Sequence, residues 1–444
     1  MHRLLPLFIP LLFIACAAQL TPENALERYI NNKDRSFAWE VTEKFASGSA
    51  TAYNLLLTSQ QWRDITWRHQ LTIIVPEVHY DGALLFITGG SVKDGVPKAK
   101  KHDDEAIQMM TDVAVDNNAI AAVLYQVPNQ PLFGDLTEDE IISHTLHNYR
   151  QDKDLTWPLL FPMAKSAVRA MDAVQEFAKK ELRLDIERFV VSGASKRGWT
   201  TWLTGASDAR VVAIAPMVID VLNMPVQMDY QITVWGDYSP QIEDYVKLEI
   251  PQAVSTPEGK ELVTMIDPYS YRARLSMPKM IFNGTNDEYW PVDAIKNYID
   301  DIPGENYLHY TPNAGHDLNS GDAALKSLSA FFAEELQGKA HPVCAWQVAE
   351  QEKGALLLLD ADAAQLRRAL LWTAVSDDRD FRAAAWDSAS VATSPRVQAF
   401  IDYPGQGYKA FYVDLIYVGP NGGEYAKSTR MFVCDAARLY PFNE

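Results

Sequence analysis

A serine set between small residues is the feature of this sequence with the clearest chemical potential. Ser195 follows the apolar run 189–191, Gly193 precedes it, and a segment compatible with a helix comes after it. A strand, a tight turn with serine at its tip and then a helix describe a nucleophile elbow. The usual pattern has glycine two residues after the serine, whereas here Arg197 takes that place and Gly198 follows. Because Gly-x-Ser also occurs in ordinary turns, the motif needs support from other residues.

Two residues further along the chain supply that support by their type and order. Asp287 comes just after the apolar segment 279–282, and His316 follows a second strand-like segment, 307–311. Serine, acid and histidine in this order is the order that α/β-hydrolases use. A serine hydroxyl is a poor nucleophile until a base takes its proton, and an imidazole held by a carboxylate can be that base. The sequence therefore predicts a catalytic triad of Ser195, His316 and Asp287.

Other residues compete for or complete these roles. Asp220 is an alternative acid, because it ends an apolar run one strand after the elbow. The oxyanion of an acyl-transfer reaction needs two backbone N–H donors. We expect one from Lys196, directly after the serine, and the other from Gly89 or Gly90, although this glycine pair also fits a plain loop.

A pair of cations and a pair of histidines each have a functional and a structural interpretation. Lys196 and Arg197 could direct the site toward an anionic substrate or could pair with acidic residues elsewhere in the chain. His144 and His147 have a helical spacing that could suit a metal, but the sequence offers no third ligand near them. We predict no metal site and no cofactor.

Three segments together resemble one protein family. The elbow 193–200, the acid loop 283–290 and the segment 312–316 are similar to those of the PhoPQ-activated pathogenicity-related protein family. The resemblance covers nearly the whole mature chain. It implies an α/β-hydrolase fold, the triad positions given above and an exported bacterial protein. The family name describes regulation, so the resemblance leaves the substrate open.

The N-terminus predicts export. A basic residue near the start is followed by a short apolar core, which is typical of a signal peptide and too short for a stable membrane anchor. We assign residues 1–16 to this signal. The segment 13–16 resembles a lipoprotein cleavage box with Cys16 as the lipidated residue, although Phe13 departs from the usual leucine. The chain would then be lipid-anchored in the bacterial periplasm or outer membrane; simple secretion and a buried N-terminal helix are the alternatives.

The remaining cysteines, Cys344 and Cys434, flank the C-terminal part of the chain. In an oxidising compartment two remaining cysteines are expected to form a disulfide. We therefore predict a bond between them, with no catalytic or metal-binding role for either.

Composition limits the classes of partner. The chain has 444 residues, of which 48% are hydrophobic, and this permits a large core. Its formal net charge of −18 argues against nucleic-acid binding, which depends on neutralising phosphates. The same charge disfavours loose adhesion to anionic membranes, so membrane contact is expected only through a lipid anchor. A small molecule or a peptide is the expected substrate, and the sequence assigns no oligomeric state.

The order of apolar segments predicts two structural regions. From 17 to 338, strand-like and helix-like segments alternate, which favours an α/β fold with a mainly parallel sheet flanked by helices. Aromatic-rich stretches near 128–160 and 222–276 interrupt the alternation after strand ends, and we interpret them as cap insertions that shape a substrate pocket. Strand-like segments dominate 342–444, which favours a small β-sandwich, with an immunoglobulin-like arrangement as one form.

The leading hypothesis is an exported serine hydrolase that forms an acyl-enzyme, with ester cleavage favoured over peptide cleavage. A non-catalytic or weakly catalytic binding or signalling protein on a hydrolase scaffold, involved in virulence, is the first alternative, since fold does not fix function. A carbohydrate-active esterase is the second, suggested by the aromatic residues of the cap stretches.

Overall fold

The computed structural model describes residues 19–393 and 396–440. The predicted signal peptide 1–16 and the predicted lipidation residue Cys16 lie outside the described residues. Across the described ranges, no helix combines the length and the apolar character needed to span a membrane.

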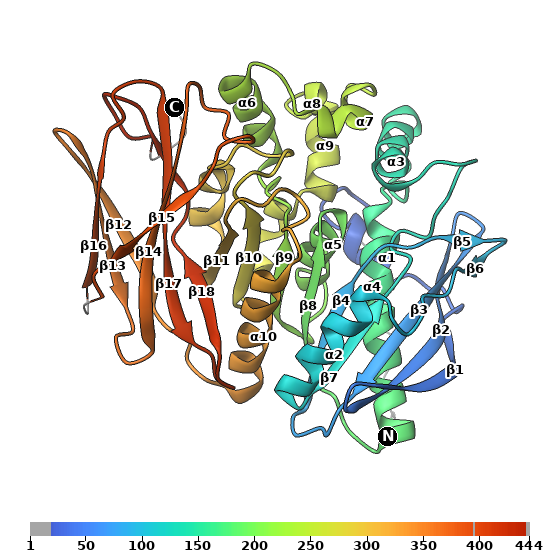
Figure 1. Cartoon of the computed structure of the whole chain (residues 1–444). Helices are drawn as coiled ribbons and strands as arrows, with labels where there is room; N and C mark the ends of the chain where they lie inside the picture. The colour runs from blue at the N-terminus through green and yellow to red at the C-terminus, as the bar shows by residue number, and fades with distance from the viewer. Residues whose placement is uncertain (1–18, 394–395, 441–444) are drawn as a thin grey trace, which may run out of the picture.

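A single large sheet runs through the molecule and organises it (Figure 1). Its middle strands are parallel, as the sequence predicted, and lie in the order β7 (Ile120–Leu124), β4 (Gly82–Ile87), β8 (Arg188–Ala194), β9 (Val211–Met217), β10 (Lys279–Gly284) and β11 (Asn306–Thr311). One edge is an antiparallel meander of β1 (Ala38–Ser47), β2 (Ala50–Trp62) and β3 (Ile65–Val75), which joins β7. Every residue of β7 and β10 is buried, as expected for strands covered on both faces.

Helices cover both faces of the parallel strands. Alternate side chains of a strand point to opposite faces, so Leu84 and Leu85 belong to two different hydrophobic cores. The core around Leu84 contains α2 (Glu105–Asn117) and α10 (Asp322–Gln337). The core around Leu85 contains α1 (Ala25–Ile30), α4 (Leu160–Phe177) and α5 (Lys196–Gly205). A π-helical turn, Ala178–Leu182, follows α4.

Two groups of helices stand above the carboxyl ends of the parallel strands, at the top of Figure 1. The stretch 128–160 contributes α3 (Glu138–Asp152). The stretch 222–276 contributes α6 (Met224–Trp235), α7 (Glu243–Val246), α8 (Ile250–Ala253) and α9 (Pro257–Ile266), with short 3-10 turns at Pro240–Ile242 and Pro268–Arg274. Further 3-10 turns, Ala294–Asn297 and Ile299–Asp301, lie between β10 and β11. The two stretches interpreted as cap insertions therefore form helices over the sheet rim where ligands bind in such folds.

After α10 the chain forms only strands among the described residues. The small sheet contains β12 (Cys344–Gln351), β13 (Gly354–Ala361) and β16 (Arg396–Asp402). The other strands are β14 (Leu366–Ser376), β15 (Asp387–Val391), β17 (Tyr408–Val418), β18 (Glu424–Ser428) and β19 (Phe432–Cys434). A two-stranded ribbon, β5 (Val92–Lys93) and β6 (Val96–Pro97), lies outside both sheets.

The C-terminal strands are joined to the large sheet by hydrogen bonds. Ser428 of β18 pairs with Leu308 of β11, so the sheet continues through β18, β17, β14 and β15. Side chains of β13 and β16 pack against those of β17 in one hydrophobic core, which gives this region two facing sheets. The sequence pattern did not predict that one of these sheets extends the central one.

The predicted disulfide is wrong. Cys344 and Cys434 are both free thiols. Cys344 Sγ contacts the carbonyl oxygen of Lys427, which lies opposite Leu415 of β17, whereas Cys434 lies opposite Lys409 of the same strand. These two positions on β17 are about 20 Å apart at the usual rise of a strand, far beyond the Cα separation of about 7 Å that a disulfide allows.

Candidate active site

Ser195 occupies a strained turn between β8 and α5. Its backbone has φ 58° and ψ −127°, a conformation that costs energy for a residue with a side chain and that is characteristic of functional turns. The turn closes tightly on two glycines. A Cβ atom at Gly193 would lie 2.9 Å from the Ile87 carbonyl oxygen, and one at Gly198 would lie 2.8 Å from that of Met217. The glycine that follows one residue late is therefore the residue that lets α5 approach β9.

The loops after β10 and β11 bring Asp287 and His316 together. Asp287 is buried, and His316 Nδ1 lies 2.9 Å and 3.1 Å from its two carboxylate oxygens. The other ring nitrogen, Nε2, is buried and has no hydrogen-bond partner among the residues that the structure describes. The imidazole is thus held by its acid and leaves one nitrogen available, although its Nε2 is not hydrogen-bonded to Ser195 in this state.

Asp220, the alternative acid, is directed elsewhere. It is buried at the end of β9 and accepts a hydrogen bond of 2.6 Å from the Tyr298 hydroxyl. Burial, together with the nearby charges of Asp287 and Asp293, raises the pKa of Asp220 to about 7. Asp287 already occupies the ring nitrogen that an acid would have to hold, so the geometry favours Asp287 for this role.

Tyr289 connects the acid, the base and the adjoining pocket, and the sequence analysis missed it. Its ring stacks on His316, with ring centroids 4.0 Å apart, and its backbone N–H donates to Asp287 Oδ1 at 2.9 Å. Burial and the negative charges of Asp139 and Asp287 raise the pKa of Tyr289 to about 12, so its hydroxyl stays protonated at neutral pH. Its place two residues after the predicted acid was the one signal available in the sequence.

A segment of the C-terminal region braces both loops. Asn286, next to the acid, donates from Nδ2 to the carbonyl oxygens of Phe381, Arg382 and Ala384 at 3.2, 3.2 and 2.7 Å. Asn313, in the histidine loop, donates to the Trp386 carbonyl at 3.0 Å and accepts from its N–H at 2.8 Å.

The two loops are also bonded to each other. The Asn286 N–H donates to Ala314, and the Asn313 N–H donates to Thr285 Oγ1, at 2.9 and 2.8 Å. The acid loop and the histidine loop are therefore held both by direct bonds and by residues 381–386 of the C-terminal region.

The predicted oxyanion donors lie in two different environments. Lys196 begins α5, and the first N–H groups of a helix have no acceptor within it. Gly89 is packed against the Arg197 guanidinium, since a Cβ atom there would lie 2.7 Å from Nη2, and its carbonyl accepts from the Gln126 N–H. Gly90 faces the Gln126 side chain. Lys196 also lines the pocket beside Ser195, whereas neither glycine does so.

The two cations of the elbow are neutralised by α3. Lys196 Nζ lies 3.0 Å from Glu138 and 3.1 Å from Asp139, and Arg197 Nη2 lies 2.7 Å from Glu138. Burial acts to raise the pKa of Glu138, but the hydrogen bond and charge of Arg197 and the charge of Lys196 outweigh it and lower this pKa to about 2. The pair therefore binds the cap to the elbow, and the idea that it directs the site toward an anionic substrate is not supported.

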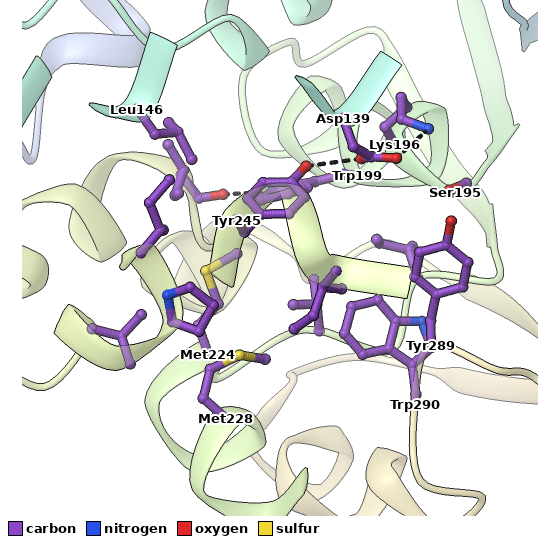
Figure 2. Close-up of a pocket in the computed structure, with 17 residues that line it drawn as sticks. Asp139, Leu146, Ser195, Lys196, Trp199, Met224, Met228, Tyr245, Tyr289 and Trp290 are labelled. Atoms are coloured by element: carbon purple, nitrogen blue, oxygen red, sulfur yellow. Dashed lines mark hydrogen bonds and ion pairs between the residues drawn. The ribbon is translucent and has the colours of Figure 1, made fainter. Parts of the chain in front are cut away.

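A pocket opens beside Ser195 between the sheet rim and the cap helices (Figure 2). Its volume is about 70 Å³. The walls combine residues of the elbow, the acid loop and the cap, and most are apolar, including Trp199, Ile219, Met224, Met228 and Trp290. The Tyr289 hydroxyl points toward Ser195 in this view. The cap stretches thus shape a pocket at the nucleophile, where ligands are expected in α/β sheets.

The fold is that of the α/β-hydrolases, with the serine on the turn after β8 and the acid and histidine on loops after later parallel strands. The chain belongs to the PhoPQ-activated pathogenicity-related protein family, whose sequence model matches residues 26–382. The resemblance noted in the sequence is thereby confirmed.

The chain is also similar to an individual relative and to solved structures. The chain is 29% identical to autocrine proliferation repressor protein A of Dictyostelium discoideum, over 95% of this chain and 90% of that protein. Among solved structures, an acetyl xylan esterase from Paenibacillus sp. R4 covers 71% of this chain and 93% of its own, with 13% identity and a TM-score of 0.50. Acetyl xylan esterase 1 from Thermoanaerobacterium sp. JW/SL YS485 covers 71% and 94%, with 17% identity and a TM-score of 0.49.

Proposed function

We propose that this protein is an exported serine hydrolase that cleaves esters through Ser195, His316 and Asp287. The observation that carries the proposal is the imidazole of His316, held at Nδ1 by a buried carboxylate and unpartnered at Nε2 among the described residues, on the sheet rim that carries a strained serine. A serine hydrolase needs this arrangement of base and orienting acid. Export is proposed from the signal-like sequence of residues 1–16.

The reaction would take place in two half-reactions. Ser195 Oγ bonds to the substrate carbonyl carbon while its proton passes to His316 Nε2, and the Lys196 N–H stabilises the negative carbonyl oxygen. The bond to the leaving alcohol oxygen then breaks, and that oxygen takes the proton from Nε2. Water repeats the sequence on the acyl-enzyme, which releases a carboxylic acid and restores the Ser195 hydroxyl.

A second candidate is a signalling protein that works by binding. The observation that favours it is the similarity, over nearly the whole chain, to a relative named for repressing proliferation. The carbohydrate-active esterase is kept as a variant of the first proposal, because acetyl xylan esterases share the fold. Fold alone decides neither.

Covalent labelling separates the enzyme from the binding protein. The purified mature chain is treated with a fluorophosphonate, and the labelled peptide is identified by mass spectrometry, with heat-denatured protein as the control. We expect one label on Ser195 in the native protein and none after denaturation. A native protein that takes up no label and cleaves no member of a broad ester and aminopeptide panel would establish the binding protein instead.

A further inference from the structure

The pocket beside Ser195 holds information on the substrate, and the inference drawn from it rests on the proposed function. The position of the pocket relative to the catalytic groups indicates which part of the substrate it would hold. Lys196, whose N–H would bind the carbonyl oxygen, lines the pocket together with Ser195, whereas His316, which would protonate the leaving group, does not. In acyl transfer these two groups lie on different sides of the reacting carbon. The pocket therefore lies on the acyl side of the serine.

The charges around the pocket cancel each other. Lys196 Nζ is paired with both Glu138 and Asp139, and the Tyr245 hydroxyl donates to Asp139 at 2.9 Å. Lys196 and Asp139 are the charged groups among the described lining residues, and both already have partners. A charged acyl group placed here would lose its hydration without gaining a counter-ion, which is costly.

The size of the pocket limits the length of the acyl group. The pocket has a volume of about 70 Å³, which is small for a ligand site. Typical ligand pockets of about 300–1,000 Å³ are far larger. Met224 and Met228 of α6 line the pocket on the side across from Ser195 (Figure 2).

We propose that this cavity is the acyl-binding pocket for a short, uncharged aliphatic acyl group. The substrates would be esters of short fatty acids, and the alcohol part would lie outside the pocket, on the side of His316. Met228 is then a residue that determines specificity, because its flexible side chain sets the depth of the pocket.

The test uses p-nitrophenyl esters, since a constant leaving group makes any difference a property of the acyl side. We expect kcat/KM to be highest for the butyrate and at least about 10-fold lower for the octanoate. The hemisuccinate, which has the length of the butyrate but carries a charge, should be slower by about 100-fold. Equal rates for butyrate and octanoate, or for butyrate and hemisuccinate, would overturn the proposal.

Two variants change the depth of the pocket in opposite directions. Met228→Ala should raise the octanoate-to-butyrate ratio about 10-fold, whereas Met109→Ala on α2, outside the pocket, should leave it unchanged. Val254→Phe should depress the butyrate more than the acetate. Such ratios do not depend on the fraction of folded protein, so partial misfolding does not affect them, and unchanged ratios in both pocket variants would refute the assignment. Failure of the proposed function looks different, because then Ser195 takes up no fluorophosphonate and none of the esters is cleaved.

Discussion

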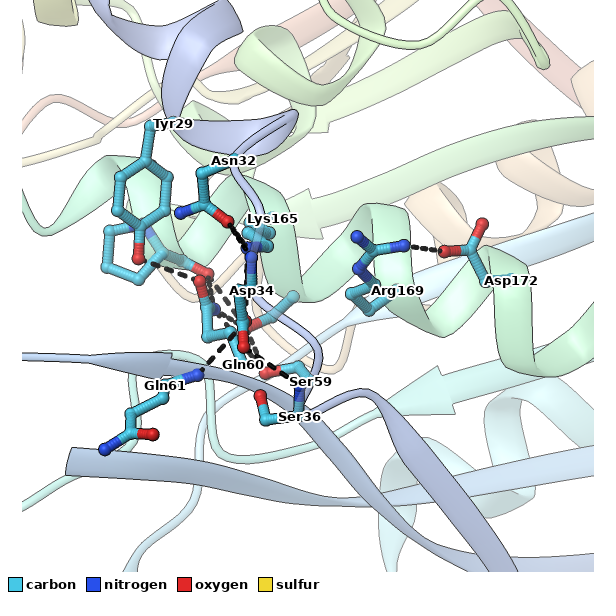
Figure 3. Close-up of polar contacts among 12 residues, drawn as sticks. Tyr29, Asn32, Asp34, Ser36, Ser59, Gln60, Gln61, Lys165, Arg169 and Asp172 are labelled. Carbon is cyan, nitrogen blue, oxygen red and sulfur yellow. Dashed lines mark hydrogen bonds and ion pairs between the residues drawn. The ribbon is translucent and has the colours of Figure 1, made fainter. Parts of the chain in front are cut away.

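Two regions of this molecule place a serine near a histidine, and only one of them has the other features of a catalytic site. In the meander, Ser59 Oγ lies 2.9 Å from His69 Nε2, a shorter contact than any that Ser195 makes with His316. Yet both residues of this pair are fully buried. Ser59 belongs to a polar cluster with Gln60, Lys165 and the N-terminal segment (Figure 3).

The histidines differ in what holds them. His69 Nδ1 is bonded to the carbonyl oxygen of Tyr125, a neutral group, and burial lowers the pKa of His69 to about 4. His316 Nδ1 is bonded to the carboxylate of Asp287. A carboxylate stabilises the imidazolium that forms when a histidine takes a proton, and a buried neutral carbonyl does so far less. The pair with the better hydrogen bond is thus the one whose histidine has no carboxylate to stabilise its imidazolium.

The serines differ in backbone and access. Ser195 has a strained, positive φ and borders a pocket, whereas Ser59 lies within the regular strand β2 and faces the core. The proposed catalytic site thus differs from the buried pair in the acid bonded to its histidine and in the cavity beside its serine. A short contact between the two side chains does not make such a site by itself.

The largest expected effect comes from deleting each serine hydroxyl. Ser195→Ala should lower kcat for an ester by about 10⁴- to 10⁶-fold, because the nucleophile is lost. Ser59→Ala should leave kcat within about 2-fold and lower the free energy of unfolding by about 1–3 kcal/mol, since it leaves buried polar groups unpaired. Turnover and urea unfolding measured on both variants check this. Lost turnover in well-folded Ser59→Ala would reverse the comparison.

The carboxylate is the next feature to remove. Asp287→Asn keeps the size of the side chain but can present an amide N–H to His316, which disfavours the productive tautomer. We expect kcat to fall by about 10³- to 10⁴-fold with the fold intact. Asp220→Asn is the matched control, and it should change kcat by less than about 10-fold because its carboxylate contacts Tyr298. If Asp220→Asn proves the more damaging change in ester turnover, the acid has been assigned to the wrong residue.

The sequence was sufficient for the local features around Ser195 and for the alternation of strands and helices. The segments 189–191, 279–282 and 307–311, expected to be strands, lie in β8, β10 and β11. The turn at Ser195 could be anticipated because small residues and serine are required where the chain bends sharply between a strand and a helix.

Features that depend on distant contacts could not be predicted. Whether Lys196 faces a substrate or an acid depends on α3, nearly sixty residues earlier, and the composition of the elbow does not encode that packing. The prediction of a disulfide was wrong for the same reason. A count of cysteines gives no distance between them, and the two thiols lie beside different positions along β17. The pairing of β18 with β11 likewise follows from tertiary packing. This pairing places the C-terminal region, with residues 381–386, beside the loops of Asp287 and His316.

The hydrogen bonds between residues 381–386 and the two loops give a third prediction, with a smaller expected effect on kcat than the first two. Asn313→Ala removes both hydrogen bonds to Trp386 and should let the histidine loop shift. A displacement of about 1 Å can cost about 100-fold, so we expect kcat to fall by about 10- to 100-fold with KM nearly unchanged. Among the described residues, no hydrogen bond joins the Ser59–His69 pair to the C-terminal region, so the contribution of His69 to the pH dependence of unfolding should not change in Asn313→Ala.

A matched control separates positioning from stability. Asn421→Ala breaks a different contact between the C-terminal strands and α2, in which Asn421 Nδ2 donates to Asp116 and Asn117 at 2.9 and 3.0 Å. We expect this variant to lower the unfolding temperature without lowering kcat at 25 °C. Equal losses of kcat in the two variants would mean that the C-terminal region only stabilises the fold.

The smallest expected effect concerns the pH dependence of the free energy of unfolding, to which the buried His69 contributes. The unfolded state binds a proton at His69 below a pKa of about 6.5, whereas the folded state does so only below about 4. Since the folded pKa is lowered, stability is lost as the pH falls below 6.5, by about 1.4 kcal/mol between pH 7.5 and 5.5 for this residue. Burial lowers the pKa of His309 to about 4 as well, so the two buried histidines together should contribute about twice that loss, whatever the other titrating groups add.

His69→Gln removes one of these two terms, because glutamine does not titrate and can still bond to Ser59 and to the Tyr125 carbonyl. Urea unfolding at both pH values should therefore show a loss about 1.4 kcal/mol smaller than in wild type. His79→Gln, at an exposed histidine, should follow wild type. A wild-type slope retained in His69→Gln would show that His69 accepts a proton while folded, and the contrast between the buried pair and the pair at the pocket would then lose its electrostatic basis.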